Sequence, residues 1–189
     1  MVNAADVLAF WFGEPPATEA REAWFRKDAA FDAQVRDRFA GTLLAALQGG
    51  LRDWDATPAG ALARIVVLDQ FTRNALRDTA QAFAGDALAQ GAAAALVERG
   101  ADLQLPPLQR WFAYLPFEHA EDLAAQERAL RLFTRLAADE PALAGALEWA
   151  RKHHAVVARF GRFPHRNAIL GRASTAEELA FLRQPGSRF

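Results

Sequence analysis

The residue types best suited to chemistry gather near the C-terminus, where the chain reads RFGRFPHRNAILGR from Arg159 to Arg172. Guanidinium groups bind carboxylates and phosphates through planar, paired hydrogen bonds. A short helix that begins after Pro164 would add backbone amides, which also favour an anion. The segment therefore predicts an anion-binding site, and its candidate residues are Arg159, Arg162, His165, Arg166, Asn167 and Arg172.

The same arginines have a second interpretation, in which they neutralise acids of the protein itself. Residues 149–176 contain no acid, whereas Asp69, Glu118, Glu121 and Asp122 lie upstream. A closed network would place each guanidinium group on a carboxylate. An anion site would instead leave several donors converging on an open spot, and the sequence leaves both arrangements open.

A second candidate lies on the helix expected from Pro58 to about Asn74. The apolar stripe of this helix continues to Asp69 and then to Arg73, an acid and a base spaced i and i+4. A carboxylate on a buried helical face must be paired or hydrogen-bonded, because an isolated buried charge is very costly. We therefore predict that Asp69 pairs with Arg73 or with an arginine of 159–172, either as an internal ion pair or as a positioned carboxylate in a pocket. Asn74 is included in the candidate site.

The third candidate is the motif FEHAED, residues 117–122. His119 with Glu121 or Asp122 has the composition of a general base and its orienting acid. The alternative is a capping cluster, since acids in the first turn of a helix are favoured by its dipole. One histidine with carboxylates, without a second matched motif, is a weak metal signal, so we predict no metal and no cofactor.

The elements that must position these residues are helices. Apolar residues recur at helical spacing through almost the whole chain, and no segment alternates as a strand would. We predict one all-α domain over residues 1–189, with short loops between antiparallel neighbours. The helices expected around the candidate residues span 58–74, 79–98, 118–137 and 141–160, and a short one ends at Pro116. Ser174-Thr175 with Glu177-Glu178 predict the capped start of a last helix.

Three further helices are expected toward the N-terminus. The first contains residues 7–12 and is stopped by Gly13 and the Pro15-Pro16 pair. The second is short, is capped by Thr18 and carries Trp24 and Phe25. The third runs from about Phe31 to Leu47 and ends at two glycines.

Composition narrows the classes of function. The chain has 189 residues, a formal net charge of −1 and no cysteine, which excludes disulfides and a thiol nucleophile. No apolar run approaches the length of a membrane span, which is about 20 residues, and no signal peptide is recognisable, so we expect a soluble cytoplasmic protein with no membrane partner. Phe160 and Phe163 alternate with arginines, but the near-zero net charge makes nucleic acid an unlikely partner.

Four segments together carry a family resemblance: WFRKDAAFD (24–32), LDQFTRN (68–74), LPFEHAED (115–122) and RFGRFPHRNAILGR (159–172). They resemble the bacterial domain-of-unknown-function family 924 (DUF924) over nearly the full chain. The resemblance implies a fold of the tetratricopeptide (TPR)-like superfamily, a right-handed stack of helical hairpins, and it implies no reaction. Thr72, Ala120 and Ala155 stand where the family usually has proline, serine and an acid. The missing hydroxyl at Ala120 argues against a serine nucleophile, and the missing acid at Ala155 argues against His153 activated by that acid.

The leading functional hypothesis is a binding module that recognises a small anionic ligand or an acidic peptide end through Arg73, Arg162, Arg166 and Arg172. The alternative is a hydrolase with His119 or His165 as general base, a neighbouring acid, and arginines that hold a phosphate or carboxylate. The third hypothesis is that these residues form a structural network of ion pairs and that the function lies elsewhere on the surface. The hydrolase requires a solvent-reached pocket with a histidine close to an acid, the binder requires the pocket alone, and the network requires neither.

Overall fold

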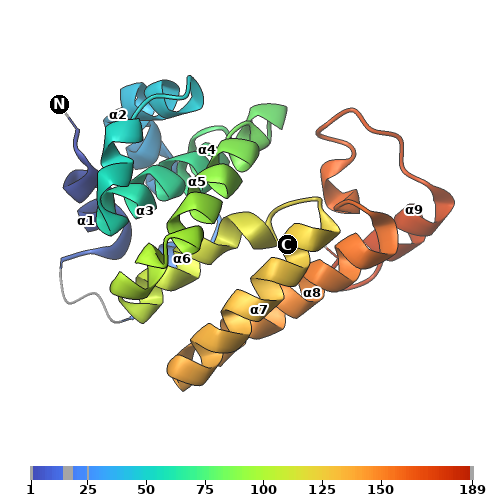
Figure 1. The fold of residues 1–189 in the computed structure, drawn as a ribbon. Coiled ribbons are helices and arrows are strands. Elements are labelled where there is room, and N and C mark those ends of the chain that lie inside the picture. The colour runs from blue at the N-terminus through green and yellow to red at the C-terminus, as the bar shows by residue number, and fades with distance from the viewer. Residues whose placement is uncertain (1, 15–18, 25, 188–189) are drawn as a thin grey trace.

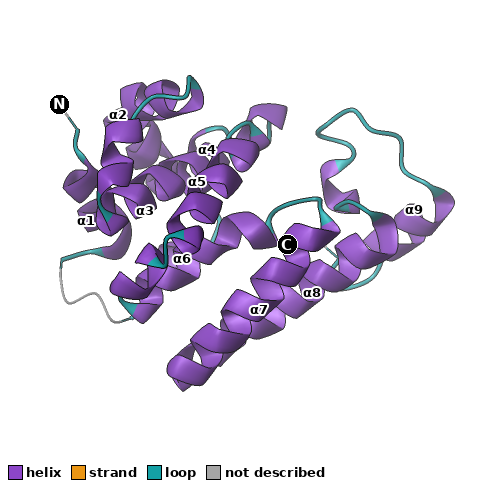
Figure 2. Ribbon diagram, in the orientation of Figure 1, coloured by secondary structure: helices purple, strands orange, loops and turns teal. Residues whose placement is uncertain are grey.

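The computed structural model describes residues 2–14, 19–24 and 26–187, and every regular element in these ranges is helical (Figures 1 and 2). The prediction of an all-α fold is therefore confirmed. The α-helices are α1 (Ala4–Phe12), α2 (Ala29–Leu47), α3 (Pro58–Val66), α4 (Thr72–Ala75), α5 (Asp86–Glu98), α6 (Pro107–Glu118), α7 (Leu123–Asp139), α8 (Ala144–Phe160) and α9 (Ala176–Leu182). Short 3₁₀ turns join most of them.

Side-chain caps explain where several helices begin. Thr57 accepts a hydrogen bond from the Gly60 amide and precedes Pro58, which has no amide hydrogen to lose at this position. Thr175 and Glu178 form the predicted capping box at the start of α9. The predicted stop of the first helix at Pro15-Pro16, the cap at Thr18 and the position of Phe25 lie outside the described residues.

The two helix boundaries predicted around FEHAED are wrong. The helix expected to stop at Pro116 continues as α6 to Glu118, because the side chains around the proline are buried and hold the last turn in place. The helix expected from residue 118 begins only at Leu123, after Asp122 caps it. His119 is therefore the C-terminal cap of α6 and Asp122 the N-terminal cap of α7, so one continuous helix does not carry both residues.

The helix that carries Asp69 changes its geometry midway. The chain continues from α3 through a π-helical turn, Val67–Phe71, directly into α4. The predicted helix from 79 begins instead with a 3₁₀ turn, and α5 starts after Gly85. A Cβ atom on Gly85 would lie 2.1 Å from the Leu68 carbonyl oxygen, so only glycine lets the start of α5 approach the π-helical turn this closely.

One apolar core connects helices from both halves of the chain. Trp11 lies at its centre, with its ring centroid 5.7 Å from those of Phe71 and Phe112. α7 and α8 lie side by side as an antiparallel hairpin, and the chain after α8 folds against one end of it (Figure 1). A smaller cluster that includes Val156, Val157 and Phe163 fixes this C-terminal segment. Stacking of hairpins into a TPR-like superhelix stays a prediction.

No helix in the described part of the chain combines the length and the apolar character that crossing a bilayer requires.

Candidate functional site

Asp69 lies at the centre of a polar cluster inside this helical frame. It is fully buried within the π-helical turn, a geometry that often marks functional positions. Its carboxylate lies 3.1 Å from Arg73 Nη1 and accepts a 2.6 Å hydrogen bond from the Gln70 side chain. The predicted Asp69–Arg73 pair is thus confirmed. Burial alone would raise the pKa of Asp69, but the charge of Arg73 and the hydrogen bonds hold it well below its usual range.

His119 is the acid's second partner. Its Nδ1 atom lies 2.7 Å from Asp69 Oδ1. Ionised Asp69 only accepts hydrogen bonds, so the proton of this bond sits on Nδ1 and the lone pair on Nε2. Burial lowers the pKa of His119, against the attraction of Asp69, so the ring is neutral at pH 7. The buried amide of Gln126 fixes the turn that carries His119 by donating to the carbonyl oxygens of Glu118 and Ala120.

A line of alternating charges extends the cluster toward the C-terminal segment. Asp86, in the first turn of α5, accepts hydrogen bonds from Arg73 at 2.8 and 3.2 Å and from Arg166 Nη1 at 3.2 Å. The Arg166 guanidinium carbon lies 4.6 Å from the ring centre of Phe83 and 4.5 Å from that of Phe163. Burial, together with the charge of Arg73, lowers the pKa of Arg166 to about 10, which leaves it charged at pH 7. Its Nε atom is buried with no hydrogen-bond partner among the described residues.

A pocket of about 370 Å³ opens over this cluster, and we call it the His119 pocket. It is lined by Phe83, Asp86, Ala87, Gln90, His119, Ala120, Glu121, Asp122, Arg166 and Leu170. The His119 side chain keeps 16% of its surface exposed, whereas Asp69 behind it keeps 1%. The site therefore has a neutral imidazole at its surface, an ionised acid behind that imidazole, and one arginine beside it.

A second acid–histidine pair lies deeper, outside the pocket lining. Glu118 Oε1 lies 3.1 Å from His153 Nδ1, which donates a 2.9 Å hydrogen bond to the Trp149 carbonyl. Burial and the charge of Asp69 raise the pKa of Glu118 to about 8, and burial lowers the pKa of His153 to about 3. The contact therefore joins two neutral groups at pH 7 rather than an ion pair. Glu118 Oε2 is buried and has no hydrogen-bond partner among the described residues.

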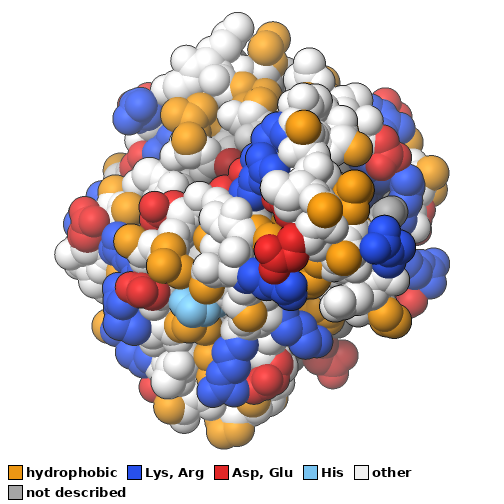
Figure 3. All heavy atoms as spheres, turned by 90° about the vertical axis from the view of Figure 1, so that its right-hand side faces the viewer, with side chains coloured by type: hydrophobic (Ala, Val, Ile, Leu, Met, Phe, Trp, Pro, Cys, Tyr) orange, Lys and Arg blue, Asp and Glu red, His pale blue; other side chains and the backbone are white. Residues whose placement is uncertain are grey.

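Other arginines of the 159–172 segment pair with acids of the protein. Arg162 binds both oxygens of Glu178 at 2.7 and 2.8 Å, and Arg159 pairs with exposed Glu177. Arg172 forms a fork on Glu121, which it shares with the Phe163 amide. On the face that shows this end of the molecule, basic and acidic side chains are interspersed (Figure 3). The segment is thus largely a closed network, and Arg166 is the arginine that it brings to the pocket.

The remaining predicted residues serve mainly as supports. Asn167 is fully buried, accepts from Arg172 and donates to Ser174 and Glu178. Asn74 lies away from the pocket and donates to Asp32, which also pairs with Arg77. Asp122 lines the pocket but accepts the Ala125 amide as the cap of α7. His165 does not line the pocket, and its ring lies 5.6 Å from that of Phe163. The 3₁₀ turn after Pro164 spans only Pro164–Arg166 and provides no helix N-terminus for an anion.

Sequence reasoning missed three parts of the site. The acid that orients His119 is Asp69, not the predicted Glu121 or Asp122. Asp86 was missed, because an acid in the first turn of a helix is common without any function. Gln90 and Phe83 carry no signal in the sequence, since only the approach of α5 to the end of α6 brings them to the pocket. Within the described ranges, no three His, Asp or Glu side chains converge as a metal site requires.

Comparison with known proteins agrees with this architecture. The model of the family described as "Bacterial protein of unknown function (DUF924)" matches residues 7–186. A solved structure of a protein of unknown function from Agrobacterium tumefaciens is 43% identical and superposes with a TM-score of 0.84, covering 95% of this chain and 96% of the other. No curated protein matches the sequence.

Proposed function

The chain belongs to the bacterial family DUF924, and we propose that it hydrolyses an acyl bond, an ester or amide, in the His119 pocket. The observation that carries the proposal is the 2.7 Å hydrogen bond from His119 Nδ1 to buried Asp69 at the edge of that pocket. Such a bond fixes the tautomer and leaves Nε2 as a base. A hydrolase requires a histidine close to an acid in a pocket that solvent reaches, whereas a binding module requires the pocket alone.

Water is the nucleophile in this proposal. The residues that line the pocket, all of them described, include no serine, threonine, cysteine or lysine, and Ala120 offers no hydroxyl beside the base. His119 Nε2 removes a proton from water while the water oxygen bonds to the acyl carbon. The carbonyl electron pair moves to oxygen, where Arg166 stabilises the negative charge. When the intermediate collapses, the leaving oxygen or nitrogen takes the proton from Nε2, and the products are an acid and an alcohol or amine.

The charges of the pocket favour a neutral reacting group. Asp86, Glu121 and Asp122 all line the pocket, and arginines already pair with the first two. A phosphate dianion would meet these three carboxylates, and Arg166, the arginine that lines the pocket, already pairs with Asp86. A carbonyl group carries no net charge, and its oxygen becomes negative only in the transition state. One arginine, Arg166, is then sufficient to stabilise that charge. Acyl substrates therefore suit this pocket better than the phosphate or carboxylate substrates of the original hydrolase hypothesis.

Anion binding without reaction is the second candidate, and it retains the original binding-module hypothesis. It rests on Arg166, whose Nε atom is buried and without a hydrogen-bond partner in the described part of the chain. A carboxylate bound in the pocket would lie against the charged guanidinium group of Arg166. Binding alone gives no role to the Asp69–His119 pair, so turnover separates the two candidates.

A cytoplasmic location also stays a prediction.

The test is a set of chromogenic substrates: p-nitrophenyl esters and anilides of short acids, with p-nitrophenyl phosphate as the contrast. His119→Gln removes the base and keeps the size of the side chain, and Arg159→Gln is the control because its exposed pair lies outside the pocket. Loss of a general base typically costs about 10²–10⁴-fold in rate. We expect such a loss for acyl substrates with His119→Gln and none with Arg159→Gln. Equal rates for the parent and His119→Gln on every acyl substrate would refute the proposal.

A further inference from the structure

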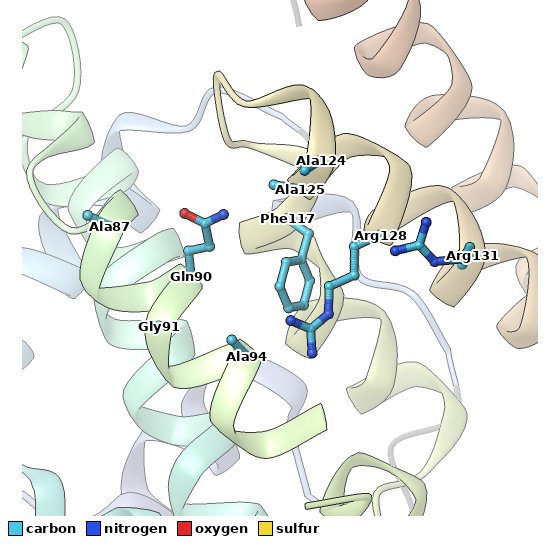
Figure 4. Close-up of a pocket in the computed structure, with 9 residues that line it drawn as sticks. All are labelled: Ala87, Gln90, Gly91, Ala94, Phe117, Ala124, Ala125, Arg128 and Arg131. Carbon is cyan, nitrogen blue, oxygen red and sulfur yellow. The ribbon is translucent and has the colours of Figure 1, made fainter. Parts of the chain in front are cut away.

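A second pocket adjoins the first and has the opposite charge. It has a volume of about 480 Å³, and we call it the Arg128 groove. Its lining consists of Ala87, Gln90, Gly91, Ala94, Phe117, Ala124, Ala125, Arg128 and Arg131 (Figure 4). Ala87 and Gln90 also line the His119 pocket, so the two spaces meet along α5. A ligand that reaches His119 can therefore extend into the Arg128 groove.

The walls of the groove suit a narrow aliphatic or flat chain. On α5, Ala87, Gly91 and Ala94 repeat at i, i+4 and i+7 and present almost no side chain. Alanines of α7 line the opposite wall, and Phe117 lies between the two helices (Figure 4). Such a surface provides apolar contact with little specificity along its length. Specificity must then come from the polar groups of the groove.

Those polar groups are the guanidinium groups of Arg128 and Arg131, which have N–H donors available to a ligand. The Arg128 guanidinium carbon lies 4.7 Å from the ring centre of Phe117, which holds it beside the groove. Among the described residues its ion-pair partner is Glu98, at 3.4 Å, whose side chain is 67% exposed. Arg131, one turn along α7, has no ion pair within the described ranges. The described residues that line the groove include two arginines and no acid, and the acid that contacts Arg128, Glu98, is largely exposed to solvent.

We propose that the Arg128 groove binds the carboxylate end of the substrate whose acyl bond lies at His119. This inference rests on the proposed function and defines its substrate class: an ester or amide joined through a short apolar chain to a free carboxylate. The His119 pocket holds the neutral reacting carbonyl. Arg128 and Arg131 hold the charged end, and the charge of each pocket thus matches a different part of one molecule.

Binding of glutarate, a short dicarboxylate that cannot be hydrolysed, tests the groove separately from the reaction. Glutaramide, the neutral diamide, is the matched control at equal ionic strength. We expect glutarate, but not glutaramide, to shift the backbone amide NMR signals of Gln90 and Gly91. A charge-assisted hydrogen bond contributes about 1.5–3 kcal/mol, so Arg128→Gln and Arg131→Gln should each weaken the Kd by about tenfold or more. Arg131 is exposed, so its variant keeps the fold.

Two further variants separate this proposal from the hydrolase itself. Arg151→Gln removes an exposed arginine of α8 with the same change of charge and should leave glutarate binding unchanged. His119→Gln should also bind glutarate like the parent. If the parent protein binds glutarate at the groove but hydrolyses no acyl substrate, the proposed hydrolase is overturned and the groove proposal stands. Absence of glutarate shifts at Gln90 and Gly91, or equal weakening by Arg151→Gln, would overturn the groove. If esters are hydrolysed, Arg131→Gln should raise KM for carboxylate-bearing esters alone, and an equal KM would also overturn it.

Discussion

Replacing Glu118 by glutamine should stabilise the protein near neutral pH and have little effect in acid. Glu118 is 3% exposed, and burial together with the charge of Asp69 raises its pKa from 4.5 to about 8. The folded state therefore keeps the proton while the unfolded chain releases it above pH 4.5. A raised carboxyl pKa contributes stability that is complete below 4.5 and is lost as the pH rises toward 8. Glutamine has nearly the same shape and never ionises.

The magnitude follows from the two pKa values. Between about pH 4 and pH 7, the ionisation of Glu118 in the unfolded chain should cost the parent about 3 kcal/mol of folding free energy, at about 1.4 kcal/mol per pH unit. Over this range the stability of Glu118→Gln relative to the parent should rise by that amount. Any change in hydrogen bonding to His153 adds a constant that does not depend on pH.

Urea unfolding at a series of pH values measures this difference. Glu148→Gln, which replaces an exposed glutamate of α8, is the matched control and should follow the parent within about 1 kcal/mol at every pH. Parallel pH profiles for Glu118→Gln and the parent would show that Glu118 is ionised in the folded state. That result would contradict the raised pKa of Glu118.

Two further predictions concern the frame of the site. Asp69→Asn removes the buried carboxylate that faces Arg73 and His119, and leaves Arg73 with its pair to Asp86. It should lower the free energy of unfolding by about 3–5 kcal/mol; because the pKa of Asp69 is depressed, this deficit should shrink as the pH falls below about 4. An unchanged denaturant midpoint at neutral pH would contradict the burial and pairing of Asp69. Gly85→Ala places a Cβ atom 2.1 Å from the Leu68 carbonyl oxygen and should cost about 1–3 kcal/mol. Gly41→Ala in α2, where a Cβ atom meets nothing within 4 Å, should instead gain about 0.5–1 kcal/mol, and equal effects of the two substitutions would contradict the close approach.

Local spacing in the sequence predicted what depends on one helix. Apolar periodicity correctly predicted α2, α3 and α8, and the i, i+4 rule predicted the Asp69–Arg73 pair. Local rules failed at Pro116, where buried neighbours keep the helix intact despite a missing hydrogen bond. Boundaries of this kind depend on packing that a single sequence does not show.

The pairs that build the candidate site join residues far apart in the chain. His119 and Asp69 are separated by 50 residues, and Arg166 and Asp86 by 80. The sequence identified His119, Asp69 and Arg166 as candidates because their types and burial patterns are unusual. For His119 it predicted Glu121 or Asp122, the acids nearest in the chain, instead of Asp69, and for Arg166 it named no single partner. Only the approach of α5 and the π-helical turn to the end of α6 decides among them.

The most direct test of the account is the protonation state of the His119 imidazole in the free protein. Nitrogen-15 NMR of the ring across a pH titration distinguishes a protonated Nδ1 from a protonated Nε2. We expect a neutral ring at pH 7, with the proton on Nδ1, a bare Nε2 and a pKa lowered by burial from its usual value. In Asp69→Asn the preference for the Nδ1 proton should weaken. A proton on Nε2 at pH 7, or a doubly protonated ring, would contradict the central claim that Asp69 holds His119 as a base facing the pocket.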